Sequence, residues 1–116
     1  MNHSQLVRER YLRDDVPTRL GGLAANLSRI KSFSSHTANQ KAVENLLDES
    51  RFFIEWTAVE TEIDTAAELV ELQIQLARWK RNWASIWEDT TLRHQVAERA
   101  SQWSKRVLEL SGLLGS

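Results

Sequence analysis

The stretch that decides the fold is Thr65–Ile86, TAAELVELQIQLARWKRNWASI, in which large apolar residues recur at alternating intervals of three and four. The recurring residues are Leu69, Leu72, Leu76, Trp79, Trp83 and Ile86. This spacing predicts one continuous helix with an apolar face. A second apolar line runs beside the first, and we expect it to face inward too; it comprises Ile63, Ala67, Val70, Ile74 and Ala77. The pattern Thr65-Ala-Ala-Glu68 predicts a capping box at the start of this helix.

The chain on both sides of this stretch is also suited to helices, because positions 23–111 contain neither glycine nor proline. We expect one helix from near Pro17 to near Ser34 and a second that opens with Thr37-Ala-Asn-Gln40, interpreted as another capping box. The last helix is expected to follow the cap-type residue Asp89 and to end near Gly112 and Gly115.

These four helices are joined by short connections, which favour antiparallel neighbours. The sequence therefore predicts an all-α protein, an antiparallel up-down-up-down four-helix bundle over residues 17–116. Residues 1–16 precede it as a separate N-terminal arm or short helix.

The composition excludes several classes of function. The 116 residues include no cysteine, so disulfides, thiolate catalysis and cysteine-bound zinc are ruled out, and we expect a cytoplasmic protein. No apolar run is long enough to span a membrane, and residues 1–13 lack the apolar core of a secretory signal. The formal net charge of −1 does not suggest nucleic-acid binding. The basic and aromatic residues of Arg78–Trp83 point in different directions around a helix, so they do not change that interpretation.

The end of the second helix is apolar on almost every side. Phe52, Trp56 and Val59 lie on a different face from Phe53, and a helix that is apolar all round is normally surrounded. A single four-helix bundle surrounds none of its helices completely. The outer face is therefore expected to be covered either by the N-terminal segment, through Tyr11 and Leu12, or by a second copy of the chain.

Small residues form a stripe on the first long helix, at Gly21, Ala25, Ser28 and Ser32. Two adjacent glycines inside a helix are costly, so some compensation is expected. The stripe predicts either the close approach of another helix, with an indole of Trp79, Trp83 or Trp103 as one possible occupant, or a shallow groove for a partner or a flat ligand.

The titratable residues give weak indications of chemistry. Asp64, Glu68 and Glu71 share one helix face near its N-terminus, where carboxylates stabilise a helix, and the chain contains no Glu-x-x-His pair, so we predict no metal site. His94 lies between Arg93 and Arg99 and resembles the phosphate acceptor of histidine phosphotransfer domains, although the lysine and glycine that follow that histidine are missing here. No phosphate-binding loop, nucleophile elbow or catalytic triad motif is present, so we expect neither enzymatic activity nor a cofactor.

Two segments, Arg19–Phe33 and Glu49–Ala58, resemble parts of small uncharacterised all-helical proteins of cyanobacteria. The resemblance covers about a third of the chain. It implies a bacterial cytosolic origin and assigns no functional residue.

The leading hypothesis from the sequence is a non-enzymatic protein–protein interaction module, a homodimeric helical bundle that contacts itself or another protein through the face around Phe52, Trp56 and Val59. Two alternatives stay open. One is a phosphotransfer-type signalling bundle with His94 as the acceptor, and the other is a bundle that holds a hydrophobic small ligand between its helices.

Overall fold

The computed structural model describes residues 2–114, and these residues are almost entirely helical. Six α-helices lie in this range: α1 (His3–Arg13), α2 (Val16–Phe33), α3 (Gln40–Thr57), α4 (Ile63–Arg81), α5 (Trp83–Glu88) and α6 (Thr90–Ser111). Two single 3₁₀ turns, η1 (Thr37–Asn39) and η2 (Ala58–Glu60), precede α3 and α4 respectively. No strand occurs between residues 2 and 114, so the expected all-α fold is confirmed.

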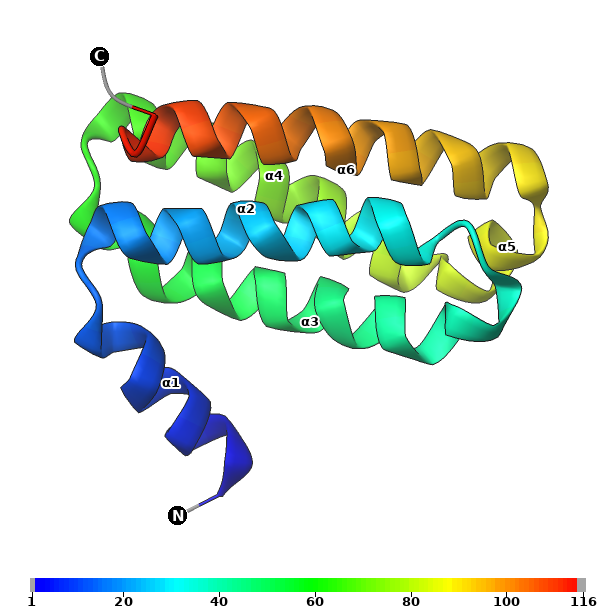
Figure 1. Cartoon of the computed structure of the whole chain (residues 1–116), viewed down its shortest axis with the longest axis horizontal. Helices are drawn as coiled ribbons and strands as arrows, with labels where there is room; N and C mark the ends of the chain where they lie inside the picture. The colour runs from blue at the N-terminus through cyan, green and yellow to red at the C-terminus, as the bar shows by residue number, and fades with distance from the viewer. Residues whose placement is uncertain (1, 115–116) are drawn as a thin grey trace.

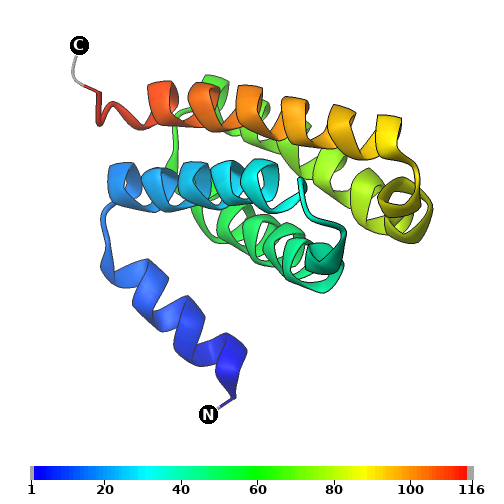
Figure 2. The ribbon, with the colours of Figure 1, turned by 45° about the vertical axis from the view of Figure 1, so that its right-hand side comes forward.

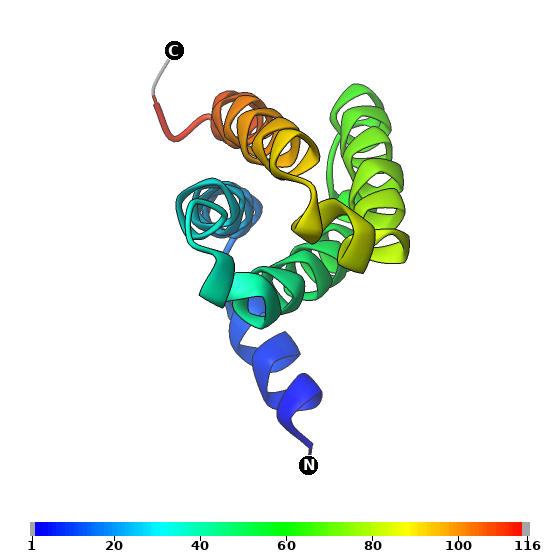
Figure 3. The same cartoon turned by 90° about the vertical axis from the view of Figure 1, so that its right-hand side faces the viewer.

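The four long helices α2, α3, α4 and α6 run side by side and alternate in direction along the chain (Figure 1). In the view of Figure 3, α2 is seen nearly end-on, whereas α4 runs obliquely to it. The contacts between the four helices are uneven: α2 packs closely on α6 and on α3, α4 packs on α3, and α4 and α6 have few contacts. The short helix α1 projects from the N-terminal end of α2 (Figure 2), packs on α3 and is hydrogen-bonded to the start of α2.

The core is built from the apolar stripes that the sequence predicts for each long helix. Leu23, Leu47, Leu72 and Val107, one from each, are fully buried. Burial of such side chains contributes about 1.5–3 kcal/mol each, which is the main force that holds the helices together. The inward direction of the stripe from Leu69 to Ile86 is thereby confirmed.

Pro17, Asp89 and Gly112 lie at the expected ends of α2 and α6, and Asp15 is an additional cap. Asp15 accepts a hydrogen bond from the Thr18 amide at 3.0 Å and Pro17 lies in the first turn of α2. Asp89 accepts from the Leu92 amide at 3.1 Å at the start of α6. Gly112 ends α6 with a φ of 76°, a conformation that glycine adopts without strain. Gly115 lies outside the described residues.

The two predicted capping boxes are wrong. Thr37 belongs to η1, and neither η1 nor α3 has a side-chain cap. Helix α4 begins at Ile63 with Glu62 as its N-cap, so Thr65 lies inside the first turn and caps nothing. The 3₁₀ turn η1 precedes α3, and α4 begins two residues before Thr65. Neither threonine therefore occupies the N-cap position of its helix.

The long helix expected from Thr65 through Ile86 is interrupted at Asn82. The side-chain amide of Asn82 donates to the Arg78 carbonyl at 3.0 Å, which offers the backbone an alternative to the helical pattern. Trp83 and Trp87 then lie on α5 and are buried. Their indole N–H groups donate to the carbonyls of Gln40 and Thr37 at 3.2 and 2.9 Å, so the break lets α5 hold the start of α3.

Candidate interaction surface

The N-terminal helix is anchored by Tyr11. Its ring is only 8% exposed and stacks on Phe53, with centroids 3.9 Å apart and planes 10° from parallel. Its hydroxyl donates to the Arg19 carbonyl at 2.8 Å and accepts from the Thr57 hydroxyl at 3.2 Å. Burial raises the pKa of Tyr11 to about 12, although the hydrogen bond from Thr57 acts in the opposite direction. Tyr11, a predicted interface residue, is thus part of the internal core.

Arg19 holds the junction between α1 and α2. It is buried, and its guanidinium donates to the carbonyls of Asp14 at 2.8 Å and Leu12 at 3.3 Å and forms an ion pair with Glu60. These bonds satisfy carbonyls at the C-terminal end of α1 that have no partner within the helix. Leu12, the other N-terminal residue of the predicted surface, is half-buried at this junction.

The remaining predicted surface residues lie on α3 and η2 and are exposed to different degrees. Trp56 is half-buried, because Tyr11 packs against it at 5.9 Å. Phe52 stacks on the other side of Trp56 at 5.6 Å and is 45% exposed, and Val59 is 86% exposed. The N-terminal helix therefore covers the Trp56 end of this face and leaves Phe52 and Val59 open.

Helix α4 carries a row of apolar residues on its outer side, which we call the outer stripe: Ile63, Ala67, Val70, Ile74 and Ala77. Ile63 is 86% exposed, Val70 51% and Ile74 48%. The expectation that this row faces inward is wrong. Ile74 lies two residues from both Leu72 and Leu76, which places it on the opposite side of the helix when those leucines are buried. That two-residue offset is the signal in the sequence that would have placed the stripe outside.

A groove lies between α3 and α4 beside Phe52. It has a volume of about 340 Å³ and is lined by Asp48, Arg51, Phe52, Glu55, Gln73 and Lys80. Two buried polar atoms that line it, Nε of Arg51 and Oε1 of Gln73, have no hydrogen-bond partner within residues 2–114. Such atoms are usually paired in folded proteins, so Arg51 Nε and Gln73 Oε1 are exceptions to the usual pairing.

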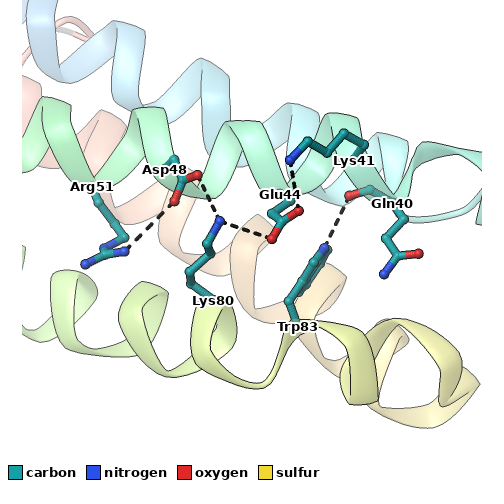
Figure 4. A network of polar contacts seen from close by, with 7 residues as sticks. All are labelled: Gln40, Lys41, Glu44, Asp48, Arg51, Lys80 and Trp83. Atoms are coloured by element: carbon teal, nitrogen blue, oxygen red, sulfur yellow. Dashed lines mark hydrogen bonds and ion pairs between the residues drawn. The ribbon is translucent and has the colours of Figure 1, made fainter. Parts of the chain in front are cut away.

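The two helices are joined beneath this groove by a polar network (Figure 4). Lys80 of α4 reaches between Glu44 and Asp48 of α3, with N···O distances of 3.1 and 3.0 Å. The hydrogen bond to Asp48 is the main cause that raises the pKa of Lys80, and the hydrogen bond from Lys80 lowers the pKa of Glu44. The network fixes the spacing of α3 and α4 and hence the position of Phe52 relative to the outer stripe.

The small-residue stripe of α2 is covered within the chain at one end only. A side chain at Gly21 would bring its Cβ to 2.7 Å from Leu113 Cδ1, so the glycine makes room for the chain that follows α6. Close by, the Ser104 hydroxyl donates to the Ala24 carbonyl at 2.7 Å, which brings α6 close to the backbone of α2. Ala25 is half-buried, whereas Ser28 and Ser32 are exposed.

The Gly21 end of the stripe is thus closely approached by the chain that follows α6, whereas its Ser28 and Ser32 end is exposed. Trp83 donates to the Gln40 carbonyl at the start of α3, and Trp103 donates to Gln75 Oε1 of α4 at 2.7 Å.

His94 is exposed on α6 and lines a shallow groove of about 300 Å³ together with Lys31, Ser34, Ser35, Ala97 and Glu98. The two arginines expected beside it are engaged elsewhere. Arg93 is buried and donates to the Trp87 carbonyl at 2.6 Å. Arg99 lies over the Trp103 ring at 5.8 Å and donates to Gln75 and Gln102. The two expected arginines are thus turned to other partners, and the cation that lines the groove with His94 is Lys31.

No cluster of three or more potential metal ligands occurs among the described residues. Glu68 accepts two hydrogen bonds from Arg106, each 2.7 Å long, and the first cause of its lowered pKa is this pairing. Within residues 2–114, no helix combines the length and the apolar character needed to cross a bilayer.

Comparison with protein-family models, curated proteins and solved structures finds no match for this chain. Its class is therefore defined by the fold and the surface: an all-helical protein that exposes apolar side chains on neighbouring parts of α3, η2 and α4.

Proposed function

We propose that this protein is a non-enzymatic interaction module that self-associates as a homodimer, built on an up-down-up-down four-helix bundle with α1 as an appendage. One observation carries the proposal: Phe52, Val59, Ile63, Val70 and Ile74 are all more than two-fifths exposed and lie on adjoining elements. A concentration of exposed apolar surface of this kind is typical of contact sites between proteins. The absence of cysteine fits action in the reducing cytoplasm.

The proposal is tested by sedimentation velocity over a range of protein concentrations. We expect the wild type to shift toward a dimer as the concentration rises and Phe52→Glu to remain monomeric, because a charge would be buried in the contact. Phe33→Glu is the matched control: Phe33 is 39% exposed at the far end of α2, so the substitution should leave the dimer intact. Circular dichroism establishes that both variants stay folded. A wild type that is monomeric at the highest attainable concentration would refute the proposal.

A second candidate function rests on the loose contact between α4 and α6. A half-open groove of about 350 Å³ lies there, with Trp79, Ile86, Leu92 and Val96 as its apolar part and Gln75, Gln95 and Arg99 at its polar part. Its volume is at the lower end of the range for small-ligand sites. A small apolar molecule retained in this groove should appear in native mass spectrometry of freshly purified protein, and its loss on Val96→Trp would assign it to the groove.

A further inference from the structure

The outer stripe of α4 has the same pattern in both directions along the helix. Ala67 and Ala77 flank the β-branched residues Val70 and Ile74, and the intervals between the four are three, four and three. The pattern is symmetric about position 72. A two-fold interface requires a surface that is complementary to itself, and a small-large-large-small row meets this requirement when it is paired with a reversed copy.

We propose that two copies of the chain associate through an antiparallel pair of α4 helices centred on position 72. This inference rests on the proposed self-association and specifies its geometry. In this pairing Val70 lies against Ile74 of the second copy, and Ala67 lies opposite Ala77 of the second copy. The two alanine layers allow the helices to approach closely, and the alternating intervals of four and three are those of an interhelical seam.

The charges beside the stripe fit this alignment. Asp64, Glu71 and Arg78 each follow a stripe residue by one position and recur every seven residues, so they line the edge of the stripe that faces away from α3. All three are exposed, and none forms an ion pair within the described part of the chain. Antiparallel pairing centred on position 72 brings Asp64 next to Arg78 of the second copy, twice by symmetry, and places the two Glu71 side chains near the axis.

Alternative alignments bury less of the stripe. In the proposed alignment Ile63 meets Arg81 of the second copy, so the whole of α4 is overlapped by its partner. A shift of one heptad toward the C-terminus leaves Ile63, with 86% of its surface exposed, beyond the end of the partner helix. On the edge nearest α3, the second helix would also lie over Phe52 and over the unpaired Arg51 Nε and Gln73 Oε1.

The chain contains no cysteine, which allows a direct test by site-specific crosslinking. We expect Ala67→Cys and Ala77→Cys proteins, mixed and allowed to exchange subunits, to form a covalent heterodimer under mild oxidation or with a short bismaleimide. Each variant alone should crosslink poorly, because two copies of position 67, or of position 77, are offset along the paired helices by ten residues, about 15 Å. A tag of different mass on one variant identifies the heterodimer.

The outcomes separate the geometry from the self-association. If sedimentation shows a dimer but the crosslink forms within each variant alone, or not at all in the mixture, the antiparallel α4 pair is refuted and the proposed function stands. If the wild type is monomeric, both fall. Circular dichroism of both cysteine variants establishes that the substitutions leave the fold unchanged.

Substitutions of the charged residues at the edge of the stripe test the alignment independently, because some should weaken the dimer and one should strengthen it. Asp64→Arg should weaken the dimer, by up to about tenfold because two exposed pairs are lost, and the double variant Asp64→Arg, Arg78→Asp should restore it. Glu71→Gln should strengthen the dimer, since it removes a repulsion at the axis. These differences should shrink at high salt. A weaker dimer on Glu71→Gln, or no recovery in the double variant, would contradict the alignment.

Discussion

Ionisation of Tyr11 provides the sharpest test of how the N-terminal helix is held. Tyr11 is the only tyrosine in the chain, so the near-ultraviolet absorbance of tyrosinate reports on this residue alone. In the folded protein the ring is buried between α1 and α3, and its pKa is raised from 10.0 to about 12. In concentrated urea the same group should titrate at its ordinary value.

The raised pKa fixes the sign and size of a change in stability. Because the ionised side chain is disfavoured in the folded chain, this contribution to stability is fully present below pH 10 and is lost as the pH rises toward about 12. The difference corresponds to about 3 kcal/mol over that interval. Tyr11→Phe keeps the stacking on Phe53 but leaves the Arg19 carbonyl and the Thr57 hydroxyl without this partner, so it should cost about 1–2 kcal/mol at neutral pH.

Urea unfolding of the two proteins, followed by circular dichroism at several pH values, measures both effects. The wild type should be the more stable protein at neutral pH, and its advantage should disappear and then reverse between pH 10 and 12. Other groups that ionise at high pH are common to both proteins and cancel in the comparison. A tyrosinate midpoint near 10 in the folded wild type would refute the docking of α1 on Phe53.

Two further predictions concern the glycines and the polar network. Gly22→Ala should stabilise the protein by up to about 1 kcal/mol, because the new Cβ would meet only Tyr11 Cε1 at 3.8 Å. Gly112→Ala should destabilise it by about 1–2 kcal/mol because of the positive φ at that position. Thermal unfolding measures both effects, and equal shifts of the two midpoints would contradict this reasoning. Lys80→Gln should cost no more than about 1 kcal/mol, since its ion pairs are partly exposed. Because the pKa of Glu44 is lowered, the contribution of its pair with Lys80 to stability is present above about pH 4.5 and is lost at lower pH. The free energies of urea unfolding of the wild type and Lys80→Gln should therefore converge in acid and in high salt. A constant difference between them would argue against the pair.

The class of fold and the ends of α2 and α6 could be predicted from the sequence because they depend on local signals. Pro17, Asp89 and Gly112 act on the backbone next to them, and the structure uses each in the expected way. The interruption at Asn82 could not be predicted from the apolar spacing, which continues through Trp83 without a change of interval. It depends on the carbonyls of Thr37 and Gln40, which are distant in sequence and receive the two indole N–H groups.

The candidate surface could be predicted only in part. Phe52 and Val59 are exposed as a helix apolar on all sides would suggest, but the burial of Tyr11 depends on a stacking partner and two hydrogen bonds from other helices. The sequence alone predicts an inward direction for the outer stripe, because the stripe runs beside the line from Leu69 to Ile86 and the two together make a broad apolar face. A helix with one broad apolar face and a helix with two opposite apolar faces have similar compositions. Only the angle around the helix axis between Leu72 and Ile74 distinguishes the two cases.

The exposure of that stripe follows from how the other helices are packed. Small residues on α2 and Ser104 on α6 bring those two helices close together, whereas α6 reaches α4 through long polar side chains, as in the pairing of Arg106 with Glu68. Among the long helices, α4 therefore packs most closely on α3, and its outer stripe is exposed within the described chain. A symmetric apolar row on the least supported helix is costly for an isolated subunit and useful for a pair, since one added contact would cover the row and hold α4 from a second side.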